Sequence, residues 1–119
     1  MVVTTEAEDV RRVRHLAQDF LVRHRLSAST CEDALLIISE LVTNALTHAL
    51  PPAVLRLRCA QRSTLRIEVE DGGSQPHRQQ RSEPSEEHGR GMFIVAALAA
   101  QHGTVTHTKG VTRWAELRP

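Results

Sequence analysis

Three polar side chains of different chemistry stand one helical turn apart near the middle of the chain. Within residues 38–49, Glu40, Asn44 and His48 follow one another at intervals of four residues. At 3.6 residues per turn, this spacing places a carboxylate, a carboxamide and an imidazole on one stripe of a helix. These three groups form a candidate functional site.

A polar stripe opposite an apolar one is normally a solvated helix face, and that interpretation stays open at this point. Two observations favour a site. Residues 27–49 contain no Lys or Arg, and Leu36 and Ile37 interrupt the polar side. A helix that is apolar around much of its circumference is usually covered on more than one side. The apolar side consists of Cys31, Ala34, Leu35, Ile38, Val42, Ala45, Leu46 and Ala49.

The length and composition predict one compact domain, residues 1–119, with a modest core. A formal net charge of +1 argues against a surface built for nucleic acid, and two Phe with one Trp leave little for base stacking. The apolar runs are too short to span a bilayer, and no signal peptide is visible at the N-terminus. Cys31 and Cys59 are interpreted as buried small hydrophobes, not as a disulfide or a zinc site. We therefore expect a cytoplasmic protein without nucleic-acid or membrane binding.

Capping patterns and apolar periodicity predict two helices in the first half of the chain, after a short extended segment at residues 1–4. Residues 5–8 and 29–32 each have the form of a capping box, and Pro51-Pro52 ends the second helix. The apolar residues at helical spacing in the first helix are Val10, Val13, Leu16, Ala17, Phe20 and Leu21.

Two runs of alternating polarity then predict a pair of strands, residues 54–59 and 64–71. Asp71 has the same parity as the apolar residues of the second run, so its carboxylate is expected to point inward. A buried carboxylate is costly unless hydrogen-bond donors reach it. The alternative is a turn-initiating Asp before Gly72-Gly73. The expected inward residues are Leu55, Leu57 and Cys59 in the first strand and Leu65, Ile67 and Val69 in the second.

A long loop is predicted between Gly72 and His88, where the sequence has no periodicity. It ends in His88-Gly89-Arg90-Gly91, directly before an apolar helix from Met92 to Ala100. Glycines at a helix entrance let backbone N–H groups approach an anion such as phosphate, although a lone Gly-x-Gly is more often a flexible turn.

The remaining residues predict a hairpin and complete the fold class. Gly103 is expected to end the third helix, and strands 104–108 and 111–117 turn at Lys109-Gly110. Trp114 and Leu117 are expected to close the core, although their parities differ and Arg113 interrupts the apolar face. The order of elements predicts an α+β two-layer sandwich, with three helices packed on one face of a mixed, mostly antiparallel sheet.

Three motifs together resemble a known family. They are Glu40-x-x-x-Asn44 on a helix, Asp71-x-Gly73 at a strand end and Gly89-x-Gly91 at a helix entrance. In this order they resemble the Bergerat ATP-binding fold of gyrases and histidine kinases (GHKL). Residues 39–49 are similar to anti-sigma factor serine kinases of the RsbW and SpoIIAB kind, and Trp114-Ala115-Glu116-Leu117 to the closing strand of small actinobacterial members. The resemblance covers residues 6–117.

The resemblance implies a role for two residues of the polar stripe. Asn44 corresponds to the Asn that coordinates Mg²⁺ through its carboxamide oxygen, which suits an ion that takes few protein ligands. Glu40 corresponds to the general base that acts on the attacking hydroxyl or water. No family role is implied for His48.

The resemblance also implies a site for ATP. Asp71 corresponds to the carboxylate that accepts a hydrogen bond from the adenine amino group, and Gly73 lets the backbone pass close to the base. Gly89, Arg90 and Gly91 correspond to the second glycine box, where backbone amides meet the phosphates. An ATP lid is expected within residues 72–91.

The sequence departs from the family pattern at three places. Gln75 stands where a further glycine is common in the first glycine box. The lid is short and includes Arg78, Arg81 and Arg90, which either reach phosphates or are solvated. The N-terminal strand is reduced to a few residues, which weakens the expectation of a homodimer formed at the sheet edge.

As a whole, the resemblance implies an Mg-ATP-dependent anti-sigma factor serine/threonine kinase that regulates transcription by partner switching. It would bind a sigma factor in one state and phosphorylate a serine on a STAS-type anti-anti-sigma protein in another. Two alternatives stay open. One is a catalytically weak or silent ATP-binding module that sequesters a protein partner, and the other is an adaptor that no longer binds ATP.

Overall fold

The computed structural model describes residues 1–5, 10–60, 64–73 and 86–118, and for residues 86–91 it describes the helical backbone alone. In chain order the elements are β1 (Val2–Thr5), α1 (Val10–Arg23), α2 (Ala28–His48), β2 (Ala53–Cys59), β3 (Leu65–Asp71), α4 (Glu86–Leu98), β4 (Gln101–His107) and β5 (Gly110–Leu117).

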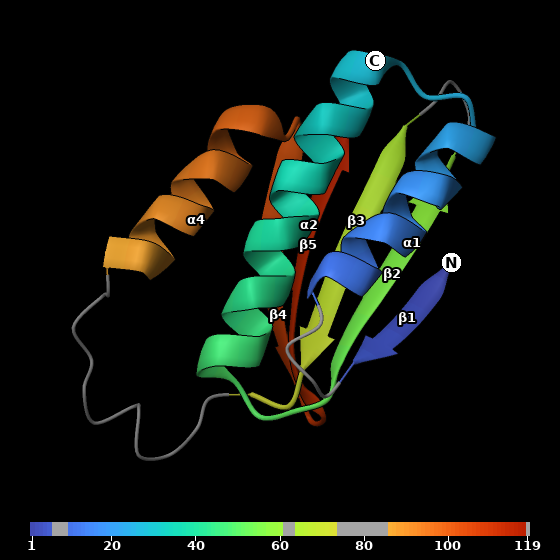
Figure 1. Ribbon diagram of the computed structural model, residues 1–119. Helices are drawn as coiled ribbons and strands as arrows, with labels where there is room; N and C mark the ends of the chain where they lie inside the picture. Colours follow the sequence, from blue (N-terminus) through green and yellow to red (C-terminus); the bar gives the residue numbers. More distant parts are fainter. Residues whose placement is uncertain (6–9, 61–63, 74–85, 119) are drawn as a thin grey trace.

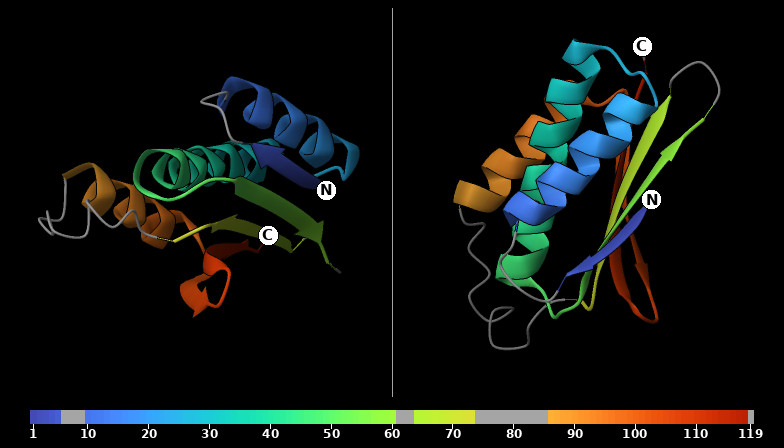
Figure 2. Two further views of the ribbon diagram at one scale, coloured as in Figure 1. Left: turned by 90° about the horizontal axis from the view of Figure 1, so that it is seen from below. Right: turned by 45° about the vertical axis from the view of Figure 1, so that its right-hand side comes forward.

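The five strands form one sheet in the order β1-β2-β3-β5-β4 (Figure 1). Each pair of neighbours is antiparallel, so the expectation of a mixed sheet was wrong for the described strands. The three helices α1, α2 and α4 lie over one face, with α2 between the other two (Figures 1 and 2). The predicted α+β two-layer sandwich is confirmed.

Helix α1 buries the apolar stripe that its periodicity predicts. Val13, Ala17, Phe20 and Leu21 are all buried. Burial of each of the larger side chains, Val13, Phe20 and Leu21, contributes about 1.5–3 kcal/mol to the free energy of folding. This burial holds the amphipathic helix against the rest of the fold. The first predicted capping box includes residues 6–8, which lie outside the described residues.

Helix α2 begins two residues earlier than its predicted capping box. Its N-cap is Ser27, whose backbone is extended and whose Oγ accepts a hydrogen bond from Thr30 N at 3.1 Å. Ser29 therefore lies inside the first turn, and its prediction as the cap was wrong. Both serines can cap a helix, and the earlier one satisfies an N–H group while lengthening the helix. The helix ends at His48, shortly before Pro51-Pro52, as expected.

The burial of α2 shows that it is covered on more than one side. It contacts α1 and α4 as well as β2, β3 and β5. Ile37, which the sequence places on the polar side, is fully buried, whereas Leu36 is 51% exposed. The scarcity of charge on this helix is therefore a consequence of its central position.

Strands β2 and β3 alternate as predicted. Leu55 and Leu57 of β2 and Leu65, Ile67 and Val69 of β3 are buried on the face under the helices. Cys59 and Cys31 are half-buried free thiols. Burial raises the pKa of the Cys59 thiol above its ordinary value, and the N-terminal charge lowers it by less.

The C-terminal half differs from prediction at its element boundaries. Helix α4 runs from Glu86 to Leu98 and not from Met92 to Ala100. Gly103 was expected to end this helix, but it lies within β4. Strand β4 accordingly starts three residues earlier than expected, at Gln101. A glycine costs about 1 kcal/mol inside a regular element, a small amount that neighbouring contacts readily override.

Trp114 does not close the core, contrary to expectation. Ala115 and Leu117 are buried under the helices, while Trp114 has the opposite parity and lies on the uncovered face. There the Arg66 guanidinium carbon lies 4.3 Å from the ring centroid. A Cβ atom at Gly103 would come within 2.8 Å of Trp114 Nε1, so the indole ring occupies the space above this glycine.

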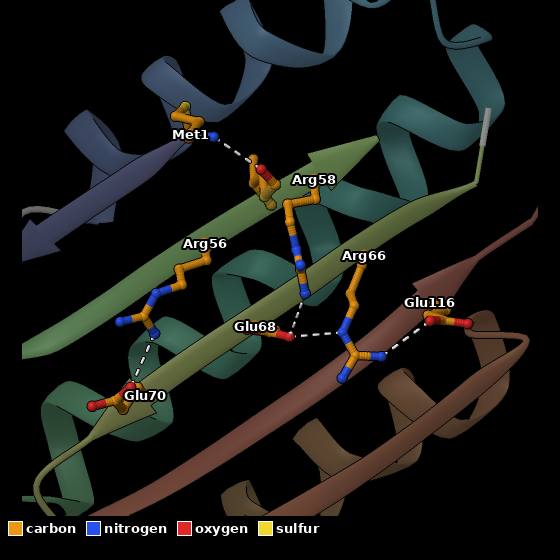
Figure 3. A network of polar contacts seen from close by, with 8 residues as sticks. Met1, Arg56, Arg58, Arg66, Glu68, Glu70 and Glu116 are labelled. Carbon is orange, nitrogen blue, oxygen red and sulfur yellow. Dashed lines mark hydrogen bonds and ion pairs between the residues drawn. The ribbon is translucent and has the colours of Figure 1, made fainter. Parts of the chain in front are cut away.

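The uncovered face carries a ladder of ion pairs around Glu68 (Figure 3). Its carboxylate accepts hydrogen bonds from Arg66 Nε at 2.7 Å and from Arg58 Nη2 at 3.2 Å. Arg66 Nη1 continues the ladder to Glu116 Oε2 at 3.0 Å. Burial by itself raises the pKa of Glu68, but the hydrogen bonds and charges of Arg66 and Arg58 outweigh it and lower the pKa. In the described part of the chain, no helix has the length and apolar character needed to cross a membrane.

Candidate functional site

The polar stripe of α2 is not a solvated face. Asn44 is buried, with 7% of its surface exposed, and Glu40 and His48 are half-buried. In the described residues, Asn44 Nδ2 and Ser39 Oγ are the buried side-chain polar atoms without a hydrogen-bond partner. An unpartnered buried amide costs about 1–3 kcal/mol, so its persistence needs an explanation such as a ligand.

Asp71 lies at the end of β3 with its carboxylate turned inward, as its parity predicts. Its side chain is 1% exposed. Oδ1 accepts a hydrogen bond from Gly73 N at 2.8 Å, and Oδ2 accepts one from Arg113 Nη1 at 2.9 Å. These two donors satisfy the requirement that a buried carboxylate must have partners.

Arg113 is a site residue that the sequence analysis did not identify. It stands on β5 opposite Val69, one position along the inward face from Val111, which pairs with Asp71. The signal was present, because Arg113 interrupts the apolar parity of β5 just as Asp71 interrupts that of β3. Two residues of opposite charge with inward parity on strands that could be neighbours predict an ion pair, but the pairing of these strands was not known.

The end of α2 and the end of β3 are tied together through Leu50. Leu50 N donates to Gly73 O at 2.8 Å, and Gly72 N donates to Leu50 O at 2.7 Å. Leu50 follows Asn44 by six residues, and Gly72 follows Asp71 directly. Asn44 and Asp71 are therefore held toward the same end of the molecule, where α2 and β3 both end (Figure 1).

Gly72, Gly73 and Gly110 lie at this end of the sheet, and a glycine is favoured at each position for a different steric reason. A Cβ atom at Gly72 would come within 2.8 Å of Leu50 O, so the close approach of the two segments requires a glycine. Gly73 has a φ of 93°, a conformation that glycine adopts readily. Gly110 has a φ of 141°, and a Cβ atom there would collide with the carbonyl oxygen of Asp71.

The second glycine box lies within a helix. Gly89, Arg90 and Gly91 were expected before the helix, but α4 begins at Glu86, so they occupy its first two turns. From its N-terminus to its C-terminus, α4 runs away from the end of the molecule at which α2 ends (Figure 1). The backbone N–H groups that an α-helix leaves unpaired are those of its first turn, so in α4 they precede Arg90 and Gly91, whose amides lie within the helix. Gln75, Arg78 and Arg81 lie outside the described residues.

The arrangement brings complementary chemical groups to one end of the sheet. Asp71 offers carboxylate oxygens as acceptors, Arg113 offers guanidinium donors, and Asn44 offers a carboxamide with unused hydrogen-bonding capacity. Glu40 adds a half-buried carboxylate one turn before Asn44. The described residues include no group of three or more His, Cys, Asp or Glu side chains placed to hold a metal ion.

Comparison with known proteins defines the class to which this fold and site belong. The model of the histidine kinase-like ATPase domain family matches residues 3–114, and the chain belongs to this family. Membership in an ATPase family implies that the chain binds ATP. This finding confirms the resemblance of the chain to the histidine kinase-like ATPase family.

A solved structure shows the same fold. The crystal structure of the RsbU and RsbW domains of Rv1364c from Mycobacterium tuberculosis matches with a TM-score of 0.75 at 20% sequence identity. The match covers 99% of this chain and 32% of that chain, so this chain spans about a third of that chain's length. A search of curated proteins gave no match.

Proposed function

We propose that this chain is an Mg-ATP-dependent anti-sigma factor serine/threonine kinase that acts in the cytoplasm by partner switching. Its substrate would be a serine on a STAS-type anti-anti-sigma protein, and its other partner a sigma factor. The observation that carries the proposal is the buried carboxamide of Asn44, whose Nδ2 has no partner among the described residues, at the same end of the molecule as the buried Asp71. The family match and the likeness to a structure that includes an RsbW domain support it.

The base of ATP is assigned to Asp71 and Gly73. The Asp71 carboxylate has about four acceptor positions, and two described donors leave capacity for the adenine amino group. Gly73 has no side chain to obstruct the base. The phosphates are assigned to the start of α4, where Gly89, Arg90 and Gly91 lie.

The carboxamide of Asn44 fits an Mg²⁺ ion. Mg²⁺ takes one or two protein ligands and completes its octahedron with phosphate oxygens and water, so a cluster of acidic residues is not required. The carboxamide oxygen of Asn44 is the atom that would hold the ion. When bound, Mg²⁺ would neutralise charge that develops on the phosphates. Asn44 itself would hold the position of the phosphate tail.

Glu40 is assigned as the general base. It precedes Asn44 by one helical turn and is half-buried, so the attacking serine hydroxyl of a partner could reach it. It would accept the proton of that hydroxyl as the bond to phosphorus forms. His48, at the last residue of α2, is given no catalytic role.

A second candidate function is an ATP-binding module that sequesters a partner without chemistry. One observation favours it, because Arg113 already engages Asp71 and so competes with the base. A competing ion pair weakens nucleotide binding without affecting a protein-docking surface.

Two measurements test the proposal in sequence. Calorimetry with Mg-ATP should show binding that Asn44→Ala weakens by at least about tenfold, whereas Thr43→Ala, an exposed neighbour on α2, should leave it unchanged. Incubation with labelled ATP and a panel of STAS-type proteins should then yield phosphoserine. Binding without phosphoserine on any partner would favour the sequestering module, and no binding would contradict the proposal.

A further inference from the structure

The ion pair between Asp71 and Arg113 presents an acceptor and a donor side by side. Arg113 Nη1 donates to Asp71 Oδ2 at 2.9 Å. A guanidinium has five N–H donors and a carboxylate about four acceptor positions, so one hydrogen bond uses little of either group. Gly73 N takes one further position on Oδ1. The pair therefore retains both donor and acceptor capacity.

Arg113 is the member of the pair that solvent reaches. Its side chain is 24% exposed, whereas the Asp71 side chain is 1% exposed. Nearly all of the pair's solvent-accessible surface therefore belongs to Arg113. Both side chains lie on the inward face of adjacent strands, Asp71 at the end of β3 and Arg113 near the start of β5.

A lone carboxylate discriminates between purines at position 6. It accepts a hydrogen bond from a 6-amino group and repels the lone pairs of a 6-oxo group. Sites built around one such hydrogen bond reject the mismatched analogue by about 10⁴-fold or more. An adjacent guanidinium removes this discrimination, because its N–H groups donate to the 6-oxo oxygen.

We propose that Arg113 widens the base specificity of this site to 6-oxopurine nucleotides, in addition to ATP. This inference rests on the proposed function, which assigns the base to Asp71. Hypoxanthine presents O6 as an acceptor and N1–H as a donor, which matches Arg113 and Asp71. Adenine presents its 6-amino group as a donor, which matches Asp71 alone, so only the 6-oxo base needs the donors of Arg113.

The test compares the binding of Mg-ITP and Mg-ATP by calorimetry in three proteins. The wild-type chain should bind ITP within about tenfold of ATP. Arg113→Met removes the hydrogen-bond donors but keeps the aliphatic stem. It should weaken the binding of ITP relative to that of ATP by about tenfold or more, as expected for the loss of one hydrogen bond to a charged group. Arg56→Met is the matched control, because Arg56 forms a single ion pair of 3.0 Å on the uncovered face. It should leave the ITP-to-ATP ratio unchanged.

The outcomes separate this inference from the function on which it rests. Wild-type protein that binds ATP at least about 10³-fold more tightly than ITP would overturn the inference and leave the proposed function intact, and this comparison needs no variant. An unchanged ITP-to-ATP ratio in Arg113→Met would show that Arg113 is not the donor. If Arg113 had only a structural role, Arg113→Met would weaken the binding of both nucleotides equally. Failure of the wild type to bind either nucleotide would contradict the proposed function itself.

Discussion

Arg113 and Asp71 form an ion pair of 2.9 Å between β5 and β3, on the face of the sheet that the helices cover. The ion pairs of Arg56, Arg58 and Arg66 lie on the opposite face, where they meet solvent. The covered pair therefore has a different environment from the ladder, since its carboxylate is almost wholly removed from water. It links the stability of the sheet to the chemistry of the site.

The ion pair predicts that substitutions at Asp71 and Arg113 have non-additive effects on the free energy of unfolding. Asp71→Asn and Arg113→Met should each lower the free energy of unfolding, and the double variant should lose less than the sum by about 1–3 kcal/mol. Urea unfolding of the four proteins measures the coupling. Strict additivity would show that the contact contributes nothing to the folded state.

Replacing Asn44 by a leucine should separate stability from function. Asn44→Leu removes the buried unpartnered amide and keeps a similar shape, so the free energy of unfolding should rise by about 1–3 kcal/mol. The same variant should lose Mg-nucleotide binding. Thermal unfolding and calorimetry check the two effects. A variant that is less stable and still binds Mg-ATP would refute the assignment of Asn44.

Glu40→Gln should retain ATP binding and lose phosphotransfer. A general base contributes about 10²–10⁴-fold to rate, and the amide cannot accept the proton. The matched control is Glu32→Gln, an exposed residue near the start of the same helix. Phosphoserine formation on a cognate STAS-type partner is the readout, and an unaltered rate would remove Glu40 from the mechanism.

Two glycines of the site should respond differently to alanine. Both Gly73 and Gly110 have positive φ, but an added Cβ atom at Gly73 meets nothing nearer than 3.8 Å, whereas at Gly110 it meets the Asp71 carbonyl. Gly73→Ala should cost about 1 kcal/mol of unfolding free energy, and Gly110→Ala clearly more or prevent folding. Equal costs, measured by urea unfolding, would contradict the steric account.

The ladder on the uncovered face predicts a dependence of stability on pH. The pKa of Glu68 is lower in the folded chain than its ordinary value of 4.5. Its contribution to stability is therefore fully present above pH 4.5 and is lost as the pH falls through the lower, folded-state pKa. Glu68→Gln should show a shallower loss of stability between neutral and acidic pH. Identical pH profiles for the two proteins would exclude this role.

The sequence predicted the layers of the fold and the burial of Asp71 because both follow from periodicity. Strand parity places Asp71 inward, and helical spacing aligns Glu40 with Asn44. Element boundaries were less accurate, as with Ser27 and Glu86, because a cap or a glycine changes local energy by about 1 kcal/mol and tertiary contacts decide the outcome.

The contacts across the sheet could not be predicted from one strand at a time. Arg113 was visible as an interruption of β5, but its partnership with Asp71 depends on which strands are neighbours and in what register. Trp114 was misplaced although its parity, opposite to that of Leu117, assigns it to the other face. Only its contacts there, over Gly103 and beside Arg66, depend on the pairing of three strands. Periodicity assigns a side chain to a face and does not identify what it meets there.

The junction at Leu50 has a consequence for how this protein can vary during evolution. Both hydrogen bonds of this junction use the backbone of Leu50, which is 41% exposed, so many residues can replace Leu50 without loss of these bonds. Gly72, on the other side of the junction, has no room for a side chain. Across descendants of this sequence, position 50 should therefore drift while position 72 stays glycine, and the attachment of the helix to the sheet would persist unchanged.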